Sequence, residues 1–205
     1  MFKEIMYIWI NIIIGDYFMK KRKQNIIDVS LKLFTELGFE GTTTAKIAEK
    51  AGINPGTLFN EFDTKNELIN ELYDYSKNEV VNALESYPMK ANSLKEVMFD
   101  IWNILIELGL KRPEIIRYIF NYNYSSFGAK LPKEQSEREL RFFTKIYDKY
   151  MNNIIPEGRK EILTLYLLHC ILILIDYIEE NPKDNEVKTR SFNILWNGFK
   201  FYEAK

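Results

Sequence analysis

The chain has 205 residues, of which 46% are hydrophobic, 15% aromatic and 28% charged, a composition that is typical of a folded globular protein and excludes a disordered one. Its single cysteine excludes an intrachain disulfide and a cysteine-based zinc site, and its single histidine argues against a metal site of several histidines. The formal net charge of −1 indicates no particular class of partner.

Residues 1–18 differ in composition from the rest of the chain. Their apolar run, at residues 5–14, is shorter than the ~20 residues that span a bilayer, and no small-residue cleavage site follows it. Met19 and four basic residues, at positions 20–23, come next. Three interpretations remain open: a weak signal or anchor sequence, an additional packed helix, or an extension upstream of a true start at Met19. We favour the last, because the helical pattern begins directly after Met19.

Apolar residues recur at helical spacing through the rest of the chain, and no segment alternates with period two, which predicts an all-α fold of about nine helices. Gly38 ends the first helix, as a glycine just beyond a helix terminus commonly does. Two later helix starts, Thr64-x-x-Glu67 and Ser93-x-x-Glu96, have the pattern of a capping box, and the first of these helices is expected to run to about residue 87. The helix starts are expected at Thr43, Asn54, Thr64, Ser93 and Pro113, with further helices at about 140–154, 157–180 and 186–203.

Gly52, Pro55 and Gly56 lie within five positions of one another between two helical segments. Gly52 can adopt the positive φ of a tight turn, Asn54 is a good N-cap, and Pro55 falls at the first helical position, where its missing N–H costs nothing. Gly56 leaves the start of this helix bare, so that its backbone can approach another molecule. The pattern predicts a helix-turn-helix with an exposed second helix. Its three-helix core is expected to contain Phe34, Ile47, Ile53 and Leu58.

Charge is distributed unevenly between the two parts of the chain. Residues 19–66 carry eight basic and six acidic side chains, a net charge of +2, whereas residues 67–205 carry 19 basic and 21 acidic side chains, a net charge of −2. A positive N-terminal module suits contact with phosphates. The alternative is a helical hairpin with ordinary surface charge.

The runs KQNIIDVSLKLFTEL and GFEGTTTAKIAEKAGINPGTLFNEFDTKNEL, within residues 21–70, resemble the DNA-binding domain of the TetR family of transcriptional repressors. The resemblance implies a homodimer on a palindromic operator and a C-terminal helical domain whose ligand releases the DNA. We therefore divide the chain into an extension (1–18), a helix-turn-helix domain (19–66) and a ligand-binding and dimerisation domain (67–205). The residues at the family's spacing are Phe34, Gly38, Thr43, Ile47, Ala48, Gly52, Gly56, Leu58, Phe62 and Lys65.

By this resemblance, a set of eleven residues is expected to contact DNA. Phe59 stands where family members usually have tyrosine, which removes a hydroxyl that could donate to a phosphate. Glu61 stands where an aromatic residue or histidine is usual, and a carboxylate there repels phosphate unless it is paired or turned away. We expect Glu61→His to tighten operator binding at fixed salt; unchanged or weaker affinity would contradict this. The expected DNA contacts are Lys21, Arg22, Thr43, Thr44, Asn54, Pro55, Gly56, Thr57, Phe59, Asn60 and Lys65.

Aromatic residues are dense between positions 99 and 150. Aromatic residues at helical spacing pack a core more often than they line a pocket, but buried tyrosine hydroxyls need partners, so a cavity with an apolar wall and a few polar groups is also expected. Such a site accepts an apolar or aromatic compound of modest size. The candidate ligand-binding residues are Phe99, Trp102, Tyr118, Tyr122, Phe143, Tyr147 and His169.

Residues 162–175 contain no charged side chain, yet the segment is too short for a membrane span. A helix that is apolar on all sides must be buried on all sides, and the family resemblance places one face on its own core and the other on a partner subunit. His169 is then a core or interface residue, or else a ligand contact. Cys170 is expected to be a small buried hydrophobe rather than a redox sensor. The stripe expected on the last helix is Phe192, Leu195, Trp196, Phe199 and Tyr202.

The sequence thus predicts a cytoplasmic transcriptional repressor that binds a double-stranded operator as a homodimer through its last two helices and is released by a small apolar or aromatic effector. The alternative is a helical small-molecule-binding protein with weakened or lost DNA binding, which Phe59 and Glu61 favour. An enzyme is disfavoured, because no glycine-rich phosphate loop, serine elbow or metal-spaced cluster is present. No catalytic residue, metal, cofactor or membrane association is expected.

Overall fold

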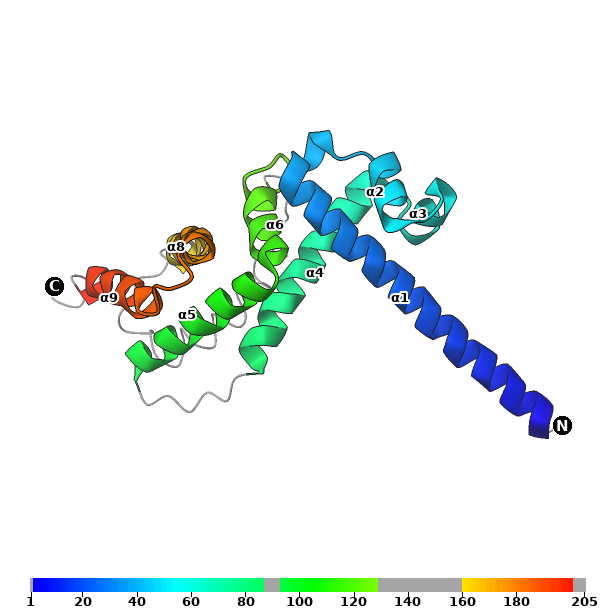
Figure 1. Ribbon diagram of the computed structural model, residues 1–205, viewed down its shortest axis with the longest axis horizontal. Helices are drawn as coiled ribbons and strands as arrows, with labels where there is room; N and C mark the ends of the chain where they lie inside the picture. The colour runs from blue at the N-terminus through cyan, green and yellow to red at the C-terminus, as the bar shows by residue number, and fades with distance from the viewer. Residues whose placement is uncertain (1, 87–92, 129–159, 201–205) are drawn as a thin grey trace. The chain divides into compact units, whose positions relative to one another are not determined.

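The structure, a computed structural model, describes residues 2–86, 93–128 and 160–200, which form eight α-helices and no strand. The chain divides into two compact units, Met1–Leu72 and Tyr73–Lys205, which we call the N-terminal unit and the C-terminal unit (Figure 1). The all-α prediction is confirmed. The helix expected at about 140–154 lies outside the described residues.

The N-terminal unit contains α1 (Phe2–Gly41), α2 (Thr44–Ala51), α3 (Pro55–Glu61) and the start of α4 (Lys65–Glu85). Helix α2 packs against both α1 and α3. Ile53, which we predicted to lie in the core of this unit, is only half-buried, because it lies in the turn between α2 and α3. The core comprises Ile26, Leu31, Phe34, Ile47, Ala48, Leu58, Phe62, Leu68 and Ile69.

Gly38 interrupts α1 with a φ of 72° and a ψ of 174°. This left-handed conformation favours glycine, so the predicted end of the first regular helix is confirmed, and a further short helical stretch follows to Gly41. The hydroxyl of the buried Thr42 donates to the carbonyls of Leu33 and Gly38, at 3.0 and 2.9 Å. These bonds connect the residue after α1 to the helix on the N-terminal side of the break and to Gly38 itself. At the other end, α1 begins at Phe2, so residues 2–18 continue directly into this helix.

Side-chain caps begin the helices where the sequence predicts them. The hydroxyls of Thr64 and Ser93 accept hydrogen bonds from the backbone N–H groups of Glu67 and Glu96, at 3.0 and 3.3 Å. The carboxylate of Glu67, however, accepts from the N–H of Asp63 at 2.7 Å, one residue before the group expected for a capping box. The caps therefore satisfy backbone donors that a helix start leaves unpaired.

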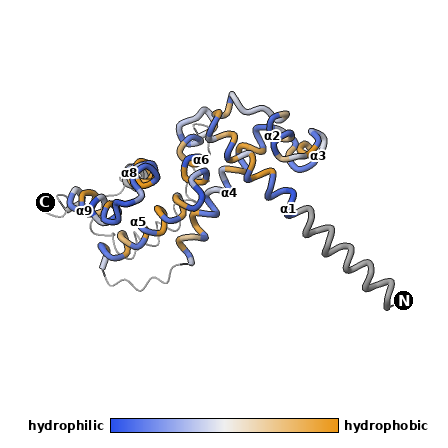
Figure 2. Tube along the Cα trace, viewed as in Figure 1, coloured by the Kyte–Doolittle hydropathy of each residue, from blue (hydrophilic) through white to orange (hydrophobic). Residues whose placement is uncertain are grey.

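The C-terminal unit contains the rest of α4, then α5 (Leu94–Lys111), α6 (Pro113–Asn123), α8 (Lys160–Glu180) and α9 (Val187–Lys200). Helix α5 packs against α6, α8 and α9, and hydrophobic segments recur along it (Figure 2). Gly109 allows α5 and α8 to approach closely, since a Cβ atom at this position would lie only 2.0 Å from Cδ1 of Ile175. The largest buried side chains of this unit are Trp102, Tyr118, Tyr122 and Phe192.

Helix α8 has a buried face and an exposed apolar face. Ile171 and Ile175 are fully buried, whereas Tyr166 and Ile173 are 55% and 69% exposed. Ile194 of α9 is 75% exposed. The expectation that α8 is buried on all sides is therefore not met within one chain. Within the described part of the chain, no helix is both long and apolar enough to cross a membrane.

Candidate nucleic-acid interface and effector site

A left-handed glycine makes the turn between α2 and α3. Gly52 has a φ of 68° and a ψ of 33°, and its N–H donates to the carbonyl of Glu49 at 3.1 Å. The next N–H, of Ile53, donates to the carbonyl of Ala48 at 3.0 Å. These bonds satisfy two of the last four carbonyls of α2, and the chain changes direction within two residues.

Helix α3 then begins with the cap that the sequence predicts. The side-chain oxygen of Asn54 accepts from the N–H of Thr57 at 2.8 Å and from its hydroxyl at 3.2 Å. Pro55 occupies the first turn, where a missing N–H is harmless. Leu58 is 1% exposed and holds one face of α3 in the core, whereas Phe59 on another face is 46% exposed.

The structure brings most of the predicted DNA contacts together on α2, α3 and the turns that precede them. Thr44 and Thr57 are half-buried, and the exposed members are Thr43, Asn54, Pro55, Gly56, Phe59 and Asn60. A short helix with its buried face in a three-helix core and its other side exposed has the form of a recognition helix for the major groove.

Lys65, expected to pair with a phosphate, has another partner in the structure. Its Nζ donates to the carbonyl of Phe39 at 2.6 Å, and its side chain is half-buried. This bond ties the start of α4 to the end of α1. Because an ammonium group has three donors, Lys65 retains the capacity for a phosphate contact beside this bond.

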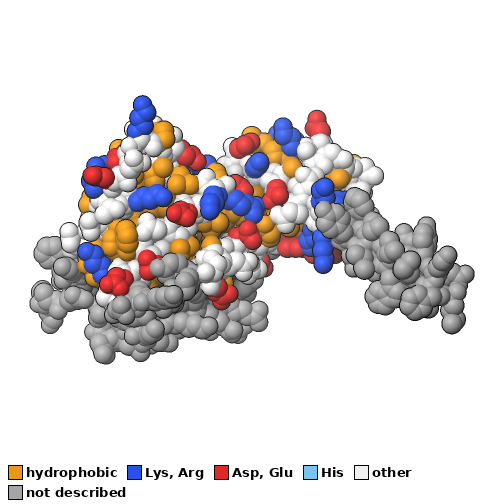
Figure 3. Space-filling model, turned by 60° about the horizontal axis from the view of Figure 1, so that its bottom comes forward, with side chains coloured by type: hydrophobic (Ala, Val, Ile, Leu, Met, Phe, Trp, Pro, Cys, Tyr) orange, Lys and Arg blue, Asp and Glu red, His pale blue; other side chains and the backbone are white. Residues whose placement is uncertain are grey.

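Glu61, the unusual carboxylate at the end of α3, is paired. Nη2 and Nε of Arg22 both donate to its Oε1, at 2.7 and 3.2 Å. Arg22 was itself expected to reach the DNA backbone, and the exposed Lys21 precedes it on α1. The neighbouring Lys23 forms an ion pair with Glu71. On the face shown in Figure 3, basic and acidic side chains are interspersed rather than gathered into one basic patch.

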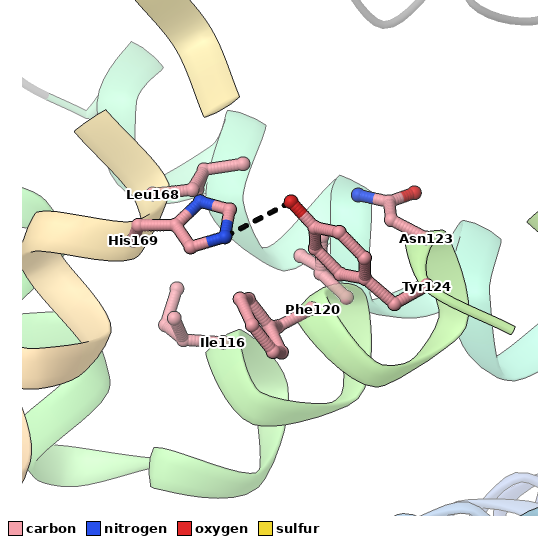
Figure 4. A pocket seen from close by; sticks show the side chains of 7 residues that line it. Ile116, Phe120, Asn123, Tyr124, Leu168 and His169 are labelled. Carbon is pink, nitrogen blue, oxygen red and sulfur yellow. Dashed lines mark hydrogen bonds between the residues drawn. The ribbon is translucent and has the colours of Figure 1, made fainter. Parts of the chain in front are cut away.

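In the C-terminal unit, a small hollow lies between α6 and α8 (Figure 4). Its volume is about 10 Å³, room for about one water molecule. The described wall is apolar apart from three side chains with polar groups, those of Asn123, Tyr124 and His169. The lining residues are Ile116, Ile119, Phe120, Asn123, Tyr124, Leu168 and His169.

His169 is the one predicted ligand-binding residue that lines this hollow in the described structure. Its Nε2 lies 2.9 Å from the hydroxyl oxygen of Tyr124, and the edge of its ring meets the ring of Phe120, with the centroids 4.8 Å apart (Figure 4). The imidazole is half-buried, so one side is held by α6 while the other borders the hollow. The contacts with α6 support a core role for His169, and its position beside the hollow supports a ligand contact.

Of the other predicted ligand-binding residues that the structure describes, Trp102, Tyr118 and Tyr122 are buried and Phe99 is half-buried. Trp102 is 2% exposed, and its indole N–H donates to the carbonyl of Lys188 at 3.0 Å. Phe99 packs against Phe192 with ring centroids 4.9 Å apart. Tyr118 and Tyr122 are also buried, and burial raises the pKa of Tyr118 far above its usual range. Phe143 and Tyr147 lie outside the described residues.

Most of the residues that line the hollow were not predicted from the sequence as ligand-binding residues. Ile116, Phe120 and Tyr124 recur every four positions, so they share one face of the α6 region, and their partners Leu168 and His169 come from a helix more than 40 positions later. The periodicity of α6 could have indicated the shared face. It could not have indicated which helix lies opposite.

One hydrogen bond joins the wall of the hollow to α4. The hydroxyl of Tyr73 donates to Oδ1 of Asn123 at 2.8 Å, and the Tyr73 ring stacks on Tyr122 with centroids 3.9 Å apart. Tyr73 is the first residue of the C-terminal unit, and the same helix begins in the N-terminal unit. Farther along α4, Glu79 accepts from Nη1 of Arg112 at 2.9 Å, at the junction of α5 and α6.

Cys170 is half-buried in α8 next to His169. Burial raises the pKa of its thiol, and a hydrogen bond with Tyr166 opposes this shift only in part. A raised pKa lowers the thiolate fraction, which favours the predicted unreactive role over a redox sensor. Within the described ranges, no group of three or more His, Cys, Asp or Glu side chains could hold a metal ion.

Comparison with known proteins agrees with this geometry. Residues 26–72 match the family model described as bacterial regulatory proteins, tetR family. The transcriptional regulator AcrR of Shigella flexneri is 23% identical over 126 residues. This alignment covers 59% of this chain and 58% of the length of AcrR. The nucleoid occlusion factor SlmA of Haemophilus influenzae is 21% identical over 87% of this chain and 84% of its own length. These relatives are regulators rather than enzymes.

Solved structures show the same fold. A TetR family transcription regulator from Marinobacter aquaeolei superposes with a TM-score of 0.76 and 21% identity, over 89% of this chain and 97% of its own. The regulator FadR from Bacillus subtilis, solved in complex with stearoyl-CoA, superposes with a TM-score of 0.61 and 18% identity. The superposition covers 84% of this chain and 95% of the FadR chain.

Proposed function

Because the chain belongs to the TetR family of transcriptional regulators and carries its DNA-binding helix-turn-helix, we propose that it is a repressor that binds a palindromic operator as a homodimer and is released by a small effector. The observation that carries the proposal is the exposed side of α3 on a buried three-helix core. Asn54, Thr57 and Asn60 of this segment are the proposed base and phosphate contacts, and Thr43, Thr44 and Lys65 flank them.

The experiment for DNA binding is an electrophoretic shift of DNA that flanks the protein's own coding region. We expect a discrete shifted complex that an excess of unlabelled specific fragment removes and an equal excess of random DNA does not. A shift that both competitors remove equally would contradict operator binding. Cytoplasmic localisation follows from the same proposal, since the operator lies there.

We propose that α8 and α9 form the dimer interface. The support is the exposed apolar face of α8, in which Tyr166, Ile173 and Tyr177 are 55%, 69% and 42% exposed, together with the 75% exposed Ile194 of α9. Removing such side chains from water is the main favourable term in the association of helical subunits. Two helices from each subunit would then make a four-helix interface.

We propose that the effector site includes the hollow between α6 and α8. Its apolar wall and its three polar groups, on Asn123, Tyr124 and His169, suit a ligand with an apolar body and a head that forms hydrogen bonds. FadR was solved with stearoyl-CoA, a ligand of this kind. Since the hollow holds about one water molecule, an effector must open it, and the Tyr73–Asn123 hydrogen bond would carry that movement to α4.

The second candidate is a helical small-molecule-binding protein with weakened DNA binding. Its support is two residues of α3: Phe59, which has no hydroxyl for a phosphate, and Glu61, which neutralises Arg22. A thermal-shift response to hydrophobic compounds, without specific DNA binding under any salt condition, would favour this candidate over a repressor.

A further inference from the structure

The ion pair between Arg22 and Glu61 joins two positions of the proposed DNA-binding surface that are 39 residues apart. Two donors of the Arg22 guanidinium, Nη2 and Nε, bind the same oxygen of Glu61 at 2.7 and 3.2 Å. The Arg22 side chain is 42% exposed and that of Glu61 is 17% exposed. The guanidinium therefore remains accessible from solvent while the carboxylate is the more enclosed partner.

This pair lowers the positive charge that the N-terminal unit can offer to a phosphate. Arg22 lies in the basic run at residues 20–23, and the carboxylate of Glu61 cancels its charge at hydrogen-bond distance. Lys23 of the same run is paired with Glu71. The sequence thus overstates the charge of this segment, because two of its four cations have acidic partners from α3 and α4.

We propose that Glu61 sets the DNA affinity of this protein by competing with a DNA phosphate for Arg22. A guanidinium binds carboxylates and phosphates through the same fork of N–H donors, and an exposed ion pair is weak, so a phosphate can replace Glu61 without unfolding the unit. The displaced carboxylate remains near the phosphate and repels it. This inference rests on the proposed DNA-binding function.

The opposite role is a positioning one, in which Glu61 holds Arg22 toward the DNA and the pair stays intact on binding. The two roles predict opposite changes in DNA affinity when the charge of Glu61 is removed. Competition predicts that removal of the Glu61 charge tightens binding, because Arg22 becomes available and a repulsive charge disappears. Positioning predicts weaker binding, because Arg22 loses the group that orients it.

The test measures the affinity of the full-length chain for two labelled duplexes by fluorescence anisotropy over a range of salt concentrations. One duplex is a genomic fragment that the purified protein retains, and the other has a random sequence. We expect Glu61→Gln to bind both about two- to fivefold more tightly. The plot of log affinity against log salt should steepen by up to about 0.9, the value for one complete phosphate contact, because Glu61 keeps Arg22 from the phosphate in part of the wild-type complexes.

Glu36→Gln is the matched control, because it makes the same change in charge at an exposed position of α1. We expect it to leave the salt dependence unchanged, because competition requires direct contact with Arg22. Arg22→Gln should cost more affinity in the Glu61→Gln background than in the wild type, because only there is Arg22 already available to DNA.

Three results would overturn the inference: a Glu61→Gln affinity that is equal to or weaker than wild type, an equal gain from Glu36→Gln, or an equal cost of Arg22→Gln in both backgrounds. Specific binding by the wild type together with any of these would leave the proposed function standing. Absence of specific binding by both the wild type and Glu61→Gln would overturn the proposed function as well.

Discussion

The N-terminal and C-terminal units differ in how their candidate functional residues are encoded in the sequence. In the N-terminal unit the proposed contacts follow from local signals: Gly52 makes the turn, Asn54 caps α3, and Leu58 orients it. In the C-terminal unit the hollow forms between Tyr124 of the α6 region and His169 of α8, which are 45 residues apart. A DNA-reading surface can therefore be recognised from short-range chemistry, whereas an effector site depends on long-range packing.

The largest expected effect is the loss of the core contact beneath α3. Leu58→Ala removes a side chain that is 1% exposed and should lower the free energy of unfolding of the N-terminal unit by about 2–5 kcal/mol. Denaturant unfolding followed by circular dichroism measures it. Leu37→Ala is the control, since Leu37 is 46% exposed and should cost less than about 0.5 kcal/mol. Equal losses from the two variants would show that α3 does not depend on this core.

The second prediction concerns the exposed face of α8. Ile173→Glu places a charge on a residue that is 69% exposed in one chain but buried in the proposed dimer, and it should raise the dimer dissociation constant by at least about 30-fold, or 2 kcal/mol. Analytical ultracentrifugation measures it. Leu37→Glu, in the other unit, should leave the dimer intact. If Ile173→Glu remains as dimeric as the wild type, the interface lies elsewhere.

The third prediction concerns the contact between α5 and α8. Gly109→Ala adds a Cβ atom 2.0 Å from Cδ1 of Ile175 and should destabilise the C-terminal unit by about 1–3 kcal/mol through overpacking. Gly198→Ala is the control, because nothing lies within 4 Å of its added Cβ and alanine is the better helix former. Thermal unfolding should show opposite shifts for the two variants. A neutral Gly109→Ala would mean that the helices can separate without cost.

The smallest expected effect returns to the N-terminal unit. Phe59→Tyr adds one hydroxyl to a side chain that is 46% exposed on α3, and one hydrogen bond to a phosphate should tighten DNA binding by about 0.5–1.5 kcal/mol, or about two- to tenfold. Anisotropy at fixed salt measures it. An affinity that does not change would place Phe59 away from the DNA backbone.

Much of the fold could be predicted because its signals are local. The caps at Thr43, Asn54, Thr64 and Ser93 and the left-handed Gly52 require only neighbouring residues. The prediction that Ile53 lies in the core was wrong, because the burial of a turn residue is not a local property. Apolar character alone does not show whether such a residue reaches the core.

The candidate sites could be predicted only in part. Helical spacing selects aromatic residues that face inward, but it does not separate those that fill the interior, such as Trp102 and Tyr118, from one that borders a hollow, such as His169. The Arg22–Glu61 pair spans 39 positions. The sequence indicates that the carboxylate of Glu61 must be paired or turned away from phosphate. It contains no local signal that Arg22 is the partner.

The central claim is that α3 reads DNA as part of a symmetric dimer. It is tested most directly by sequencing the genomic DNA fragments that the purified wild-type protein retains, with Leu58→Ala as the comparison. We expect enrichment of an inverted repeat whose half-sites are centred about one helical turn apart, or a multiple of it, and loss of that enrichment in the variant. Retained fragments without a shared inverted repeat, or the same enrichment by both proteins, would contradict the claim.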